Sequence, residues 1–542
     1  MKGRLSYDLM TLAISPFFEN PVSSSQGVMD VDLVYGEKGT SLNISNAVVY
    51  LPHLTITGGV QISRRDGDGT IALNLNTTPI PLPSMKDYLP VRVLPPGFSD
   101  VLKGITLSRG KVEVTQLKLA GGFQELKNPE HYKRPDSLYI RLGLKDAGFG
   151  YKGFKRAFSN VDGVVLWKGG VVMLQGVKGR YGGTLVEAMD GEIQDVFLSP
   201  GVRLRASATM DMAETLEEFK HRVKVMEKWQ KVEGRVSLDL ELTGKMKMPD
   251  RVSYRGKVRP KGLGLVHKDL PFPLKDITGE VEFDDNSLTL AKLTGLFGAS
   301  SFNLDGTVQN YQEEKPYLDI KASGGLNQGV FEVFFKDWGI AELKFDKEVD
   351  FRVAIQGRRG LDLSIKSFVD ATRTNLLYSS WIKKDEGYPL TVEASLRIKG
   401  KGMDMDKVTV RFGASSIDIA GHIPYQRGQG VKGSREDNHL NQPLTIKTTN
   451  LKIDDLDGMV PFLRTEFPSK GLISAQLKIK WGRKTSIDGE ARVQAGEFET
   501  NILPKKVSNV DLVARISGNS GSLIVKDMWV GSSNISGRIE SP

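Results

Sequence analysis

Residues that commonly carry chemistry are few in this chain and widely scattered. The 542 residues include no cysteine, which excludes thiolate nucleophiles, thiolate metal ligands and disulfides. The six histidines contain no i, i+4 pair; they are His53, His131, His221, His267, His422 and His439. Histidine metal sites usually need such a pairing or a similar grouping. The sequence therefore predicts no metal site and no cofactor.

Other motifs that resemble functional loops lack the residues that the chemistry needs. The glycine-rich stretch Gly176–Gly183 does not end in the Gly-Lys-Ser/Thr of a phosphate loop and opens no expected helix. The run Asp284-Asp-Asn-Ser287 lacks the later ligands of a calcium loop. No Gly-x-Ser-x-Gly nucleophile elbow stands between an expected strand and helix. These stretches are typical of strand bends and turns, and we expect no enzyme and no catalytic residue.

Composition and charge narrow the class of partner. Lys and Arg total 74 against 65 Asp and Glu, and the surplus of +9 is spread along the whole chain. Nucleic-acid-binding proteins concentrate basic residues on one face or helix, and this chain has no such block, so no nucleic-acid partner is expected. No apolar run reaches the 18 residues of a transmembrane helix, and residues 1–20 lack the pattern of a signal peptide.

The elements that must position any site are β-strands. Apolar and polar residues alternate in Leu138–Leu144 and again in Val236–Leu242, and the same pattern returns from end to end of the chain. Side chains alternate across a strand, so this pattern predicts strands with one apolar face and one wet face. Turn chemistry between neighbouring runs, as at Asp284–Ser287, favours antiparallel pairing. The expected fold is all-β with a few short helices.

Internal repetition is the strongest signal in the sequence. The segment Phe297-Gly-Ala-Ser-Ser, which ends at Gly306, is echoed by Phe412-Gly-Ala-Ser-Ser, which ends at Gly421. Looser copies end at Gly191 and Gly537, and successive closing glycines are 115, 115 and 116 residues apart. In each copy we expect a strand, a bend and a second strand, with a glycine able to adopt a positive φ. This regularity predicts an elongated antiparallel β-groove that repeats every 115 residues or so.

Helical periodicity interrupts the strands at three places. Helices are expected at Ala213–Lys231, Asn327–Trp338 and, less clearly because of Pro461, Leu456–Phe467. Polar residues at 426–442 and prolines at 79–96 predict irregular loops. These features divide the chain into an N-terminal groove segment (1–212), two units of helix plus β-repeat (213–323 and 324–425), and a segment at 426–542 with a polar loop, a short helix and a last repeat.

The apolar face then carries the question of function. An ordinary dry β-core would give the same alternation, and a structural or adhesive β-repeat protein is the alternative that remains open. The pattern continues for over 500 residues, however, and this favours one sheet curled around an apolar trough, where acyl chains would gain about 0.8 kcal/mol per buried methylene. Candidate lipid-contacting positions are Val236, Leu238, Leu240, Leu242, Val281, Phe283, Leu288, Leu290, Phe302, Leu304, Val353, Ile355, Leu396, Ile398, Ile417, Ile419, Leu477 and Ile479.

Several stretches resemble a known family. The run Pro271-Phe-Pro-Leu-Lys-Asp-Ile-Thr-Gly-Glu-Val-Glu-Phe283, continued by Leu288–Leu290 and by Phe297–Gly306, resembles the recurring unit of AsmA-like proteins, especially the YhdP and TamB branches. Residues Tyr88–Pro96, Gly104–Gly122, Ala147–Phe154 and Gly176–Asp190 resemble the central region of YhdP-type proteins. The likeness covers most of the chain as a pattern of glycines and alternation.

The resemblance implies a bridge-like β-groove in the periplasm of a Gram-negative bacterium. It would carry phospholipid between the inner and outer membranes and so serve outer-membrane lipid homeostasis. Its partners would be phospholipid acyl chains and, at the ends of the full-length protein, the two membranes. Family members usually start with a membrane anchor, which this sequence lacks, and it stops just after the closing Gly537. We therefore expect a segment of a larger protein that is anchored in the inner membrane.

Overall fold

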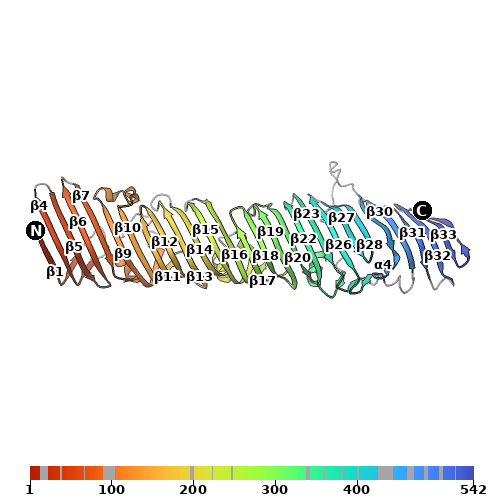
Figure 1. Cartoon of the computed structure of the whole chain (residues 1–542), viewed down its shortest axis with the longest axis horizontal. Helices are drawn as coiled ribbons and strands as arrows, with labels where there is room; N and C mark the ends of the chain where they lie inside the picture. The colour runs from red at the N-terminus through yellow and green to blue at the C-terminus, as the bar shows by residue number, and fades with distance from the viewer. Residues whose placement is uncertain are drawn as a thin grey trace. The chain divides into compact units, whose positions relative to one another are not determined.

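A computed structural model describes most of the chain. The described residues are 1–12, 22–36, 39–65, 68–88, 104–195, 200–221, 224–245, 248–336, 342–358, 361–379, 382–399, 402–424, 443–460, 469–480, 486–499, 505–518 and 520–541. Thirty of the described strands form one antiparallel sheet, so the all-β expectation is confirmed. Strands that are neighbours in this sheet are also near neighbours along the chain. The strands fall into two units, which Figure 1 shows in chain order.

The first unit comprises Met1–His267 with Glu282–Asp285. Each strand pairs with the next along the chain in an antiparallel meander. The strands are β1 (Lys2–Tyr7), β4 (Gln26–Gly36), β5 (Gly39–Leu51), β6 (Leu54–Arg65), β7 (Asp68–Thr77), the short β8 (Ile80–Pro81), which like β7 pairs with β9, β9 (Ile105–Gly122), β10 (Leu138–Tyr151), β11 (Phe158–Lys168), β12 (Val171–Tyr181), β13 (Thr184–Gln194), β14 (Gly201–Asp211), β15 (Trp229–Lys245) and β16 (Met248–His267). A small ribbon, β2 (Met10–Leu12) and β3 (Val22–Ser24), forms a separate sheet.

The second unit comprises Lys268–Val281 with Asn286–Pro542 and repeats the same meander. Its strands are β17 (Leu274–Phe283, to Val281 in this unit), β18 (Ser287–Phe297), β19 (Ser300–Gln309), β20 (Tyr317–Leu326), β22 (Val349–Arg358), β23 (Asp362–Asp370), β26 (Leu390–Lys399), β27 (Gly402–Phe412), β28 (Ser415–Pro424), β29 (Leu444–Lys452), β30 (Ser469–Lys480), β31 (Ser486–Phe498), β32 (Val507–Ser517), β33 (Ser520–Val530), β34 (Ser533–Asn534) and β35 (Gly537–Ser541). Three short strands, β21 (Lys344–Phe345), β24 (Leu376–Tyr378) and β25 (Ile382–Lys384), form a separate small sheet.

The sequence repeat corresponds to a hairpin that returns after every six strands of the large sheet. Its two-residue turns begin at Gly182, Gly298, Gly413 and Gly531, with φ of 58°, 62°, 55° and 62°. These left-handed values favour glycine because it has no Cβ. Among the closing glycines, Gly306 and Gly421 share a φ of 141°, whereas Gly191 and Gly537 have no positive φ. The expectation of a positive φ is therefore confirmed in two of the four copies.

The first expected helix is shorter than its periodicity predicts, whereas the ends of the other two expected helices lie outside the described residues. Helix α2 spans Met212–Phe219, a 3-10 turn follows at Lys224–Lys228, and β15 starts at Trp229, so the helix expected to reach Lys231 is wrong in length. Helix α3 spans Gln328–Phe335 and α4 spans Ile453–Asp457. Most of the third expected helix lies outside the described residues, as does the polar loop at 426–442. Within the proline-rich stretch, a 3-10 helix covers Leu82–Tyr88.

Each helix is tied to the hairpin that precedes it. The residue after the turn offers its hydroxyl oxygen to the backbone N–H of the residue that caps the helix: Thr184 accepts from Asp211 at 3.2 Å, Ser300 from Asn327 at 2.7 Å and Ser415 from Lys452 at 2.9 Å. A carboxylate in the first turn of α2 and of α4 accepts a backbone N–H from the same hairpin turn. In each unit the helices therefore lie beside the strand ends at which these hairpins turn.

Removing one of these hydroxyls should loosen its helix. Ser415 accepts from the Lys452 N–H and donates to the Asp455 carboxylate, and Ser415→Ala leaves both groups without that partner. We expect a loss of about 1 kcal/mol in unfolding free energy, since an intramolecular hydrogen bond contributes about 0.5–1.5 kcal/mol. Urea unfolding and amide exchange across 452–457 measure it. Ser416→Ala is the matched control, and an equal effect of both substitutions would contradict the assignment.

The buried core gathers where the helices meet the sheet. Met212 and Leu216 of α2 form one cluster with Val232 and Val236 of β15. A second cluster contains Phe331 of α3 together with Phe412 and Leu451, and Leu456 of α4 packs against it. A third surrounds Leu82 and Val112 in the N-terminal strands. Burial is therefore concentrated beside the helices.

Candidate functional site

The apolar side chains of the first unit form rows that cross many strands. Residues directly opposite each other in antiparallel strands lie on the same face. One such row runs from Leu75 on β7 to Val202 on β14, and every member is apolar and half-buried. Its members are Leu75, Leu117, Ile140, Trp167, Val172, Ile193 and Val202.

The second unit contains a longer row of the same kind. It runs Leu293, Leu304, Ala322, Val353, Ser367, Ala394, Val408, Ile419, Ile446, Leu477, Gly489 and Ile516, from β18 to β32. Only Ser367 in it carries a polar group, and no member is charged. Leu293 is buried and Ile516 is 44% exposed, while the side chains between them are half-buried. This face is therefore apolar but remains partly accessible to solvent.

The predicted positions mostly lie in such rows. Leu304, Val353, Ile419 and Leu477 belong to the row just described, and Leu290, Ile355 and Leu396 to the row beside it. Five more predicted positions lie on the same face, at other points along their strands: Leu288, Phe302, Ile398, Ile417 and Ile479. The apolar face of β15 contains Leu238, Leu240 and Leu242. Val281 and Phe283 lie on β17, where the Phe283 ring is 6.1 Å from that of Tyr254.

Val236 differs from the other predicted positions. It is only 2% exposed and belongs to the core cluster beneath α2, whereas the other seventeen side chains are half-buried. Strand register also adds positions that sequence reasoning did not include, such as Ile140 and Trp167. The alternation at Leu138–Leu144 was the available signal for Ile140, and only the pairing of strands shows which positions align.

The accessible surface agrees with a face that has little covering it. Buried apolar side chains beside the helices account for the covered part of the sheet. Large apolar side chains elsewhere on strands stay open to solvent, among them Leu33 at 37% and Ile487 at 40%.

The opposite face of the sheet carries cross-strand ion pairs. Arg203 lies 3.0 Å from Glu192, Arg259 lies 2.8 Å from Asp239, and Arg492 lies 2.7 Å from Asp511. The hydrogen bond from Arg259 holds the pKa of Asp239 below its usual value, and Arg492 does the same for the pKa of Asp511. Both faces thus match the expected division into one apolar and one wet side.

One carboxylate gives a testable pH dependence. Asp346 accepts hydrogen bonds from the Asn375 side chain at 2.6 Å and the Asn375 backbone at 2.9 Å, and these lower its pKa to about 2 from an ordinary 3.8. Because the pKa of Asp346 is lower in the folded chain than in the unfolded chain, its ionised carboxylate stabilises the fold at pH values above the unfolded pKa. This stabilisation is lost as the pH falls towards 2.

The melting temperature of the wild type should therefore exceed that of Asp346→Asn at pH 6, and the gap should shrink below about pH 4. Thermal unfolding between pH 2 and 7 measures it. Asp350→Asn serves as the control. A gap that stays constant across this range would contradict the assignment.

In the described part of the chain, no group of three or more histidine, aspartate and glutamate side chains is arranged to hold a metal ion. His131 bonds the Ala120 carbonyl at 2.9 Å, and His422 lies 2.7 Å from the Asp404 carboxylate. His439 lies outside the described residues.

None of the described helices has the length and hydropathy needed to cross a bilayer. The family model described as YhdP protein matches residues 1–528. Comparisons with curated proteins and with solved structures gave no match. The match supports the YhdP branch of the resemblance and does not extend to TamB. Since it covers nearly the whole chain, the protein belongs to the YhdP family.

Proposed function

We propose that the apolar face binds the acyl chains of phospholipids and forms part of a bridge along which lipid passes between the inner and outer membranes. The observation that carries this proposal is the uncharged row from Leu293 to Ile516, which crosses twelve strands and is half-buried at the ten positions between its two ends. Each methylene that such a surface removes from water contributes about 0.8 kcal/mol. A row without charges offers acyl chains similar contacts at each of its positions. This suits movement of lipid along the row.

The family supports the setting of this proposal. YhdP proteins are cell-envelope proteins, and membership is consistent with bridge-like lipid transport. We place the chain in the periplasm of a Gram-negative bacterium, as part of a full-length protein anchored in the inner membrane. Its role there would be outer-membrane lipid homeostasis. The proposal contains no catalytic step, requires no cofactor and involves no nucleic acid.

The alternative is a structural or adhesive repeat protein with a dry core. A dry core would bury the middle of each apolar row, as it does at Val232 and Val236 beneath α2. The predicted positions farther from the helices, such as Leu304 and Ile419, are only half-buried in the described structure. This difference favours the lipid-binding proposal.

Native mass spectrometry with lipid extraction tests the proposal on the purified chain. We expect several phospholipids to copurify with each chain, because the apolar rows span many strands. A folded, monomeric and lipid-free chain would instead support the dry structural repeat. Circular dichroism on the same sample confirms that the sheet is folded.

A further inference from the structure

The wet face changes character over three strands of the first unit. Elsewhere it carries cross-strand ion pairs, but β5, β6 and β7 present uncharged side chains at mid-strand. Asn43 lies directly opposite Gln61, and Asn74 lies directly opposite Gly59. The Thr57 hydroxyl donates to the Asn76 side chain, and Asn46 donates to Asp30 at 3.0 Å. Amide and hydroxyl groups thus replace charges in this region.

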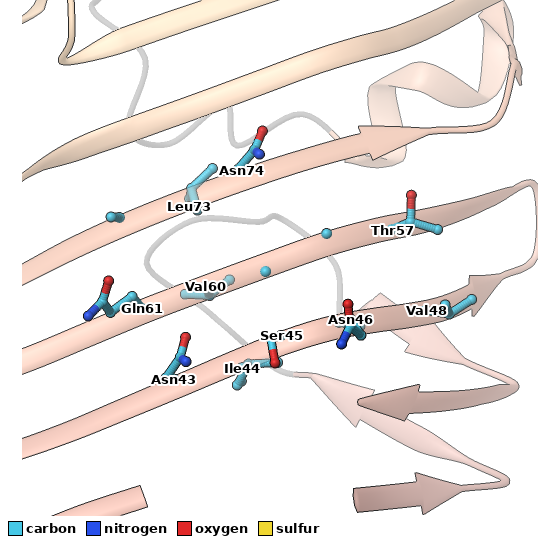
Figure 2. Close-up of a pocket in the computed structure, with 14 residues that line it drawn as sticks. Asn43, Ile44, Ser45, Asn46, Val48, Thr57, Val60, Gln61, Leu73 and Asn74 are labelled. Carbon is cyan, nitrogen blue, oxygen red and sulfur yellow. The ribbon is translucent and has the colours of Figure 1, made fainter. Parts of the chain in front are cut away.

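A shallow depression of about 620 Å³ lies over these three strands (Figure 2). Its lining includes Asn43, Gln61 and Asn74 along with Thr57 and Asn46, which are labelled in the view. The lining consists of residues 43–48, 57–61 and 72–74, so it includes Val60 and Leu73 of the apolar face, but the stretches on β6 and β7 begin and end with wet-face residues, as at Thr57, Gln61 and Asn74. The depression therefore opens on the wet side, away from the proposed lipid surface.

The floor of the depression is kept free of side chains. Gly58 has a φ of 144°, and a Cβ there would lie 2.1 Å from the Asn74 carbonyl oxygen. A Cβ on Gly59 would lie 2.8 Å from the Ile44 carbonyl oxygen. A bulge in β5 after Ile44 shifts the register between β5 and β6 at the two glycines. Local geometry therefore requires two adjacent glycines at this point and leaves a hollow above the second.

The amide side chains around the hollow are available to a ligand. Asn43, Gln61 and Asn74 are exposed, and within the described residues their side chains make no recorded hydrogen bond. Each amide supplies two donors and an acceptor with two lone pairs. Asn43 and Gln61 face each other on neighbouring strands, so their Cβ atoms are about 5 Å apart. Three such groups converge on one hollow without a charge among them.

We propose that this hollow, which we call the amide hollow, binds a neutral saccharide. Sugar hydroxyls donate and accept hydrogen bonds at once, as side-chain amides do, whereas phosphate or carboxylate ligands are bound best by Arg and Lys. The bare glycine floor and Ala72 offer a small flat surface for the C–H face of a sugar ring. This inference is independent of lipid binding because it uses the other face of the sheet.

Saturation-transfer NMR on the full chain tests the proposal with two neutral probes, maltoheptaose and chitotetraose. We expect transfer to at least one of them in the millimolar range. The variant Asn43→Ala/Gln61→Ala/Asn74→Ala should weaken it at least tenfold, while Asn303→Ala, on the wet face of β19, should leave it unchanged. These are exposed positions, so the fold and the copurifying lipid should be retained.

Three results would overturn the amide hollow as a saccharide site. The first is the absence of transfer to both probes in a folded chain. The second is equal binding by the triple variant and the wild type. The third is tighter binding of an anionic probe, such as sulfated maltoheptaose, than of maltoheptaose itself. Loss of lipid from the wild type would bear on the proposed function and not on this site.

Discussion

Aspartate at Leu304 and Ile419 together should remove most copurifying phospholipid from the chain. Both side chains lie in the long apolar row of the second unit, on β19 and β28. An ionised carboxylate loses its hydration when an acyl chain covers it, and this costs several kcal/mol against about 0.8 kcal/mol per methylene gained. We expect at least a tenfold drop in lipid per chain by native mass spectrometry, together with loss of photo-crosslinking to lipid and of transport.

The neighbouring wet-face positions supply a matched control for this experiment. Asn303→Asp on β19 and Ala420→Asp on β28 place the same charge one residue away, where side chains point to the opposite face. These controls should retain the lipid. If the Leu304→Asp/Ile419→Asp protein is folded by circular dichroism and keeps its lipid and its transport, the apolar rows do not bind acyl chains.

Alanine at Gly306 or Gly421 should be among the most destabilising single substitutions in the chain. Both glycines have a φ of 141°, which side-chain-bearing residues rarely adopt. A Cβ would lie 2.1 Å from the Asp319 carbonyl oxygen at Gly306 and 2.4 Å from the Pro443 carbonyl oxygen at Gly421. Strain of this kind costs about 1–3 kcal/mol, and the clash with backbone adds to it. Urea unfolding measures the loss.

Gly143 provides the contrasting case. It lies within β10, has no positive φ, and a Cβ there would meet no atom within 4 Å. Gly143→Ala should therefore be neutral or slightly stabilising, by up to about 1 kcal/mol, because alanine restricts the unfolded chain. Similar losses at Gly143, Gly306 and Gly421 would mean that backbone conformation does not set the requirement for glycine.

The strands and their faces follow directly from local sequence. Alternation such as Val236–Leu242 needs no tertiary information, because a strand alone places every second side chain on one face. The repeat was equally visible, since the turn glycines Gly298 and Gly413 must be glycine wherever that hairpin forms. These features depend on the backbone of one or two strands.

Features that depend on neighbouring strands could not be predicted in the same way. The amphipathic pattern of Ala213–Lys231 suits a long helix, but Asp211 at the end of β14 pairs with Arg235 of β15, so the chain must return within this stretch, and the helix ends at Phe219. Val236 has the same alternation as Leu238, and only the packing of α2 distinguishes it. The amide hollow depends on the bulge in β5, which determines which residue faces Gly59.

The six-strand hairpin period has a consequence for how such a chain can change in length. Neighbouring strands run in opposite directions, so after six strands the chain is back at the same end of the strands. The helix of the next repeat therefore lies at that same end. Gain or loss of one repeat would preserve both the parity of strand direction and the identity of the apolar face. An odd number of strands would move the next helix to the opposite edge. Strand parity therefore favours gains and losses of an even number of strands, and the six-strand repeat meets this condition.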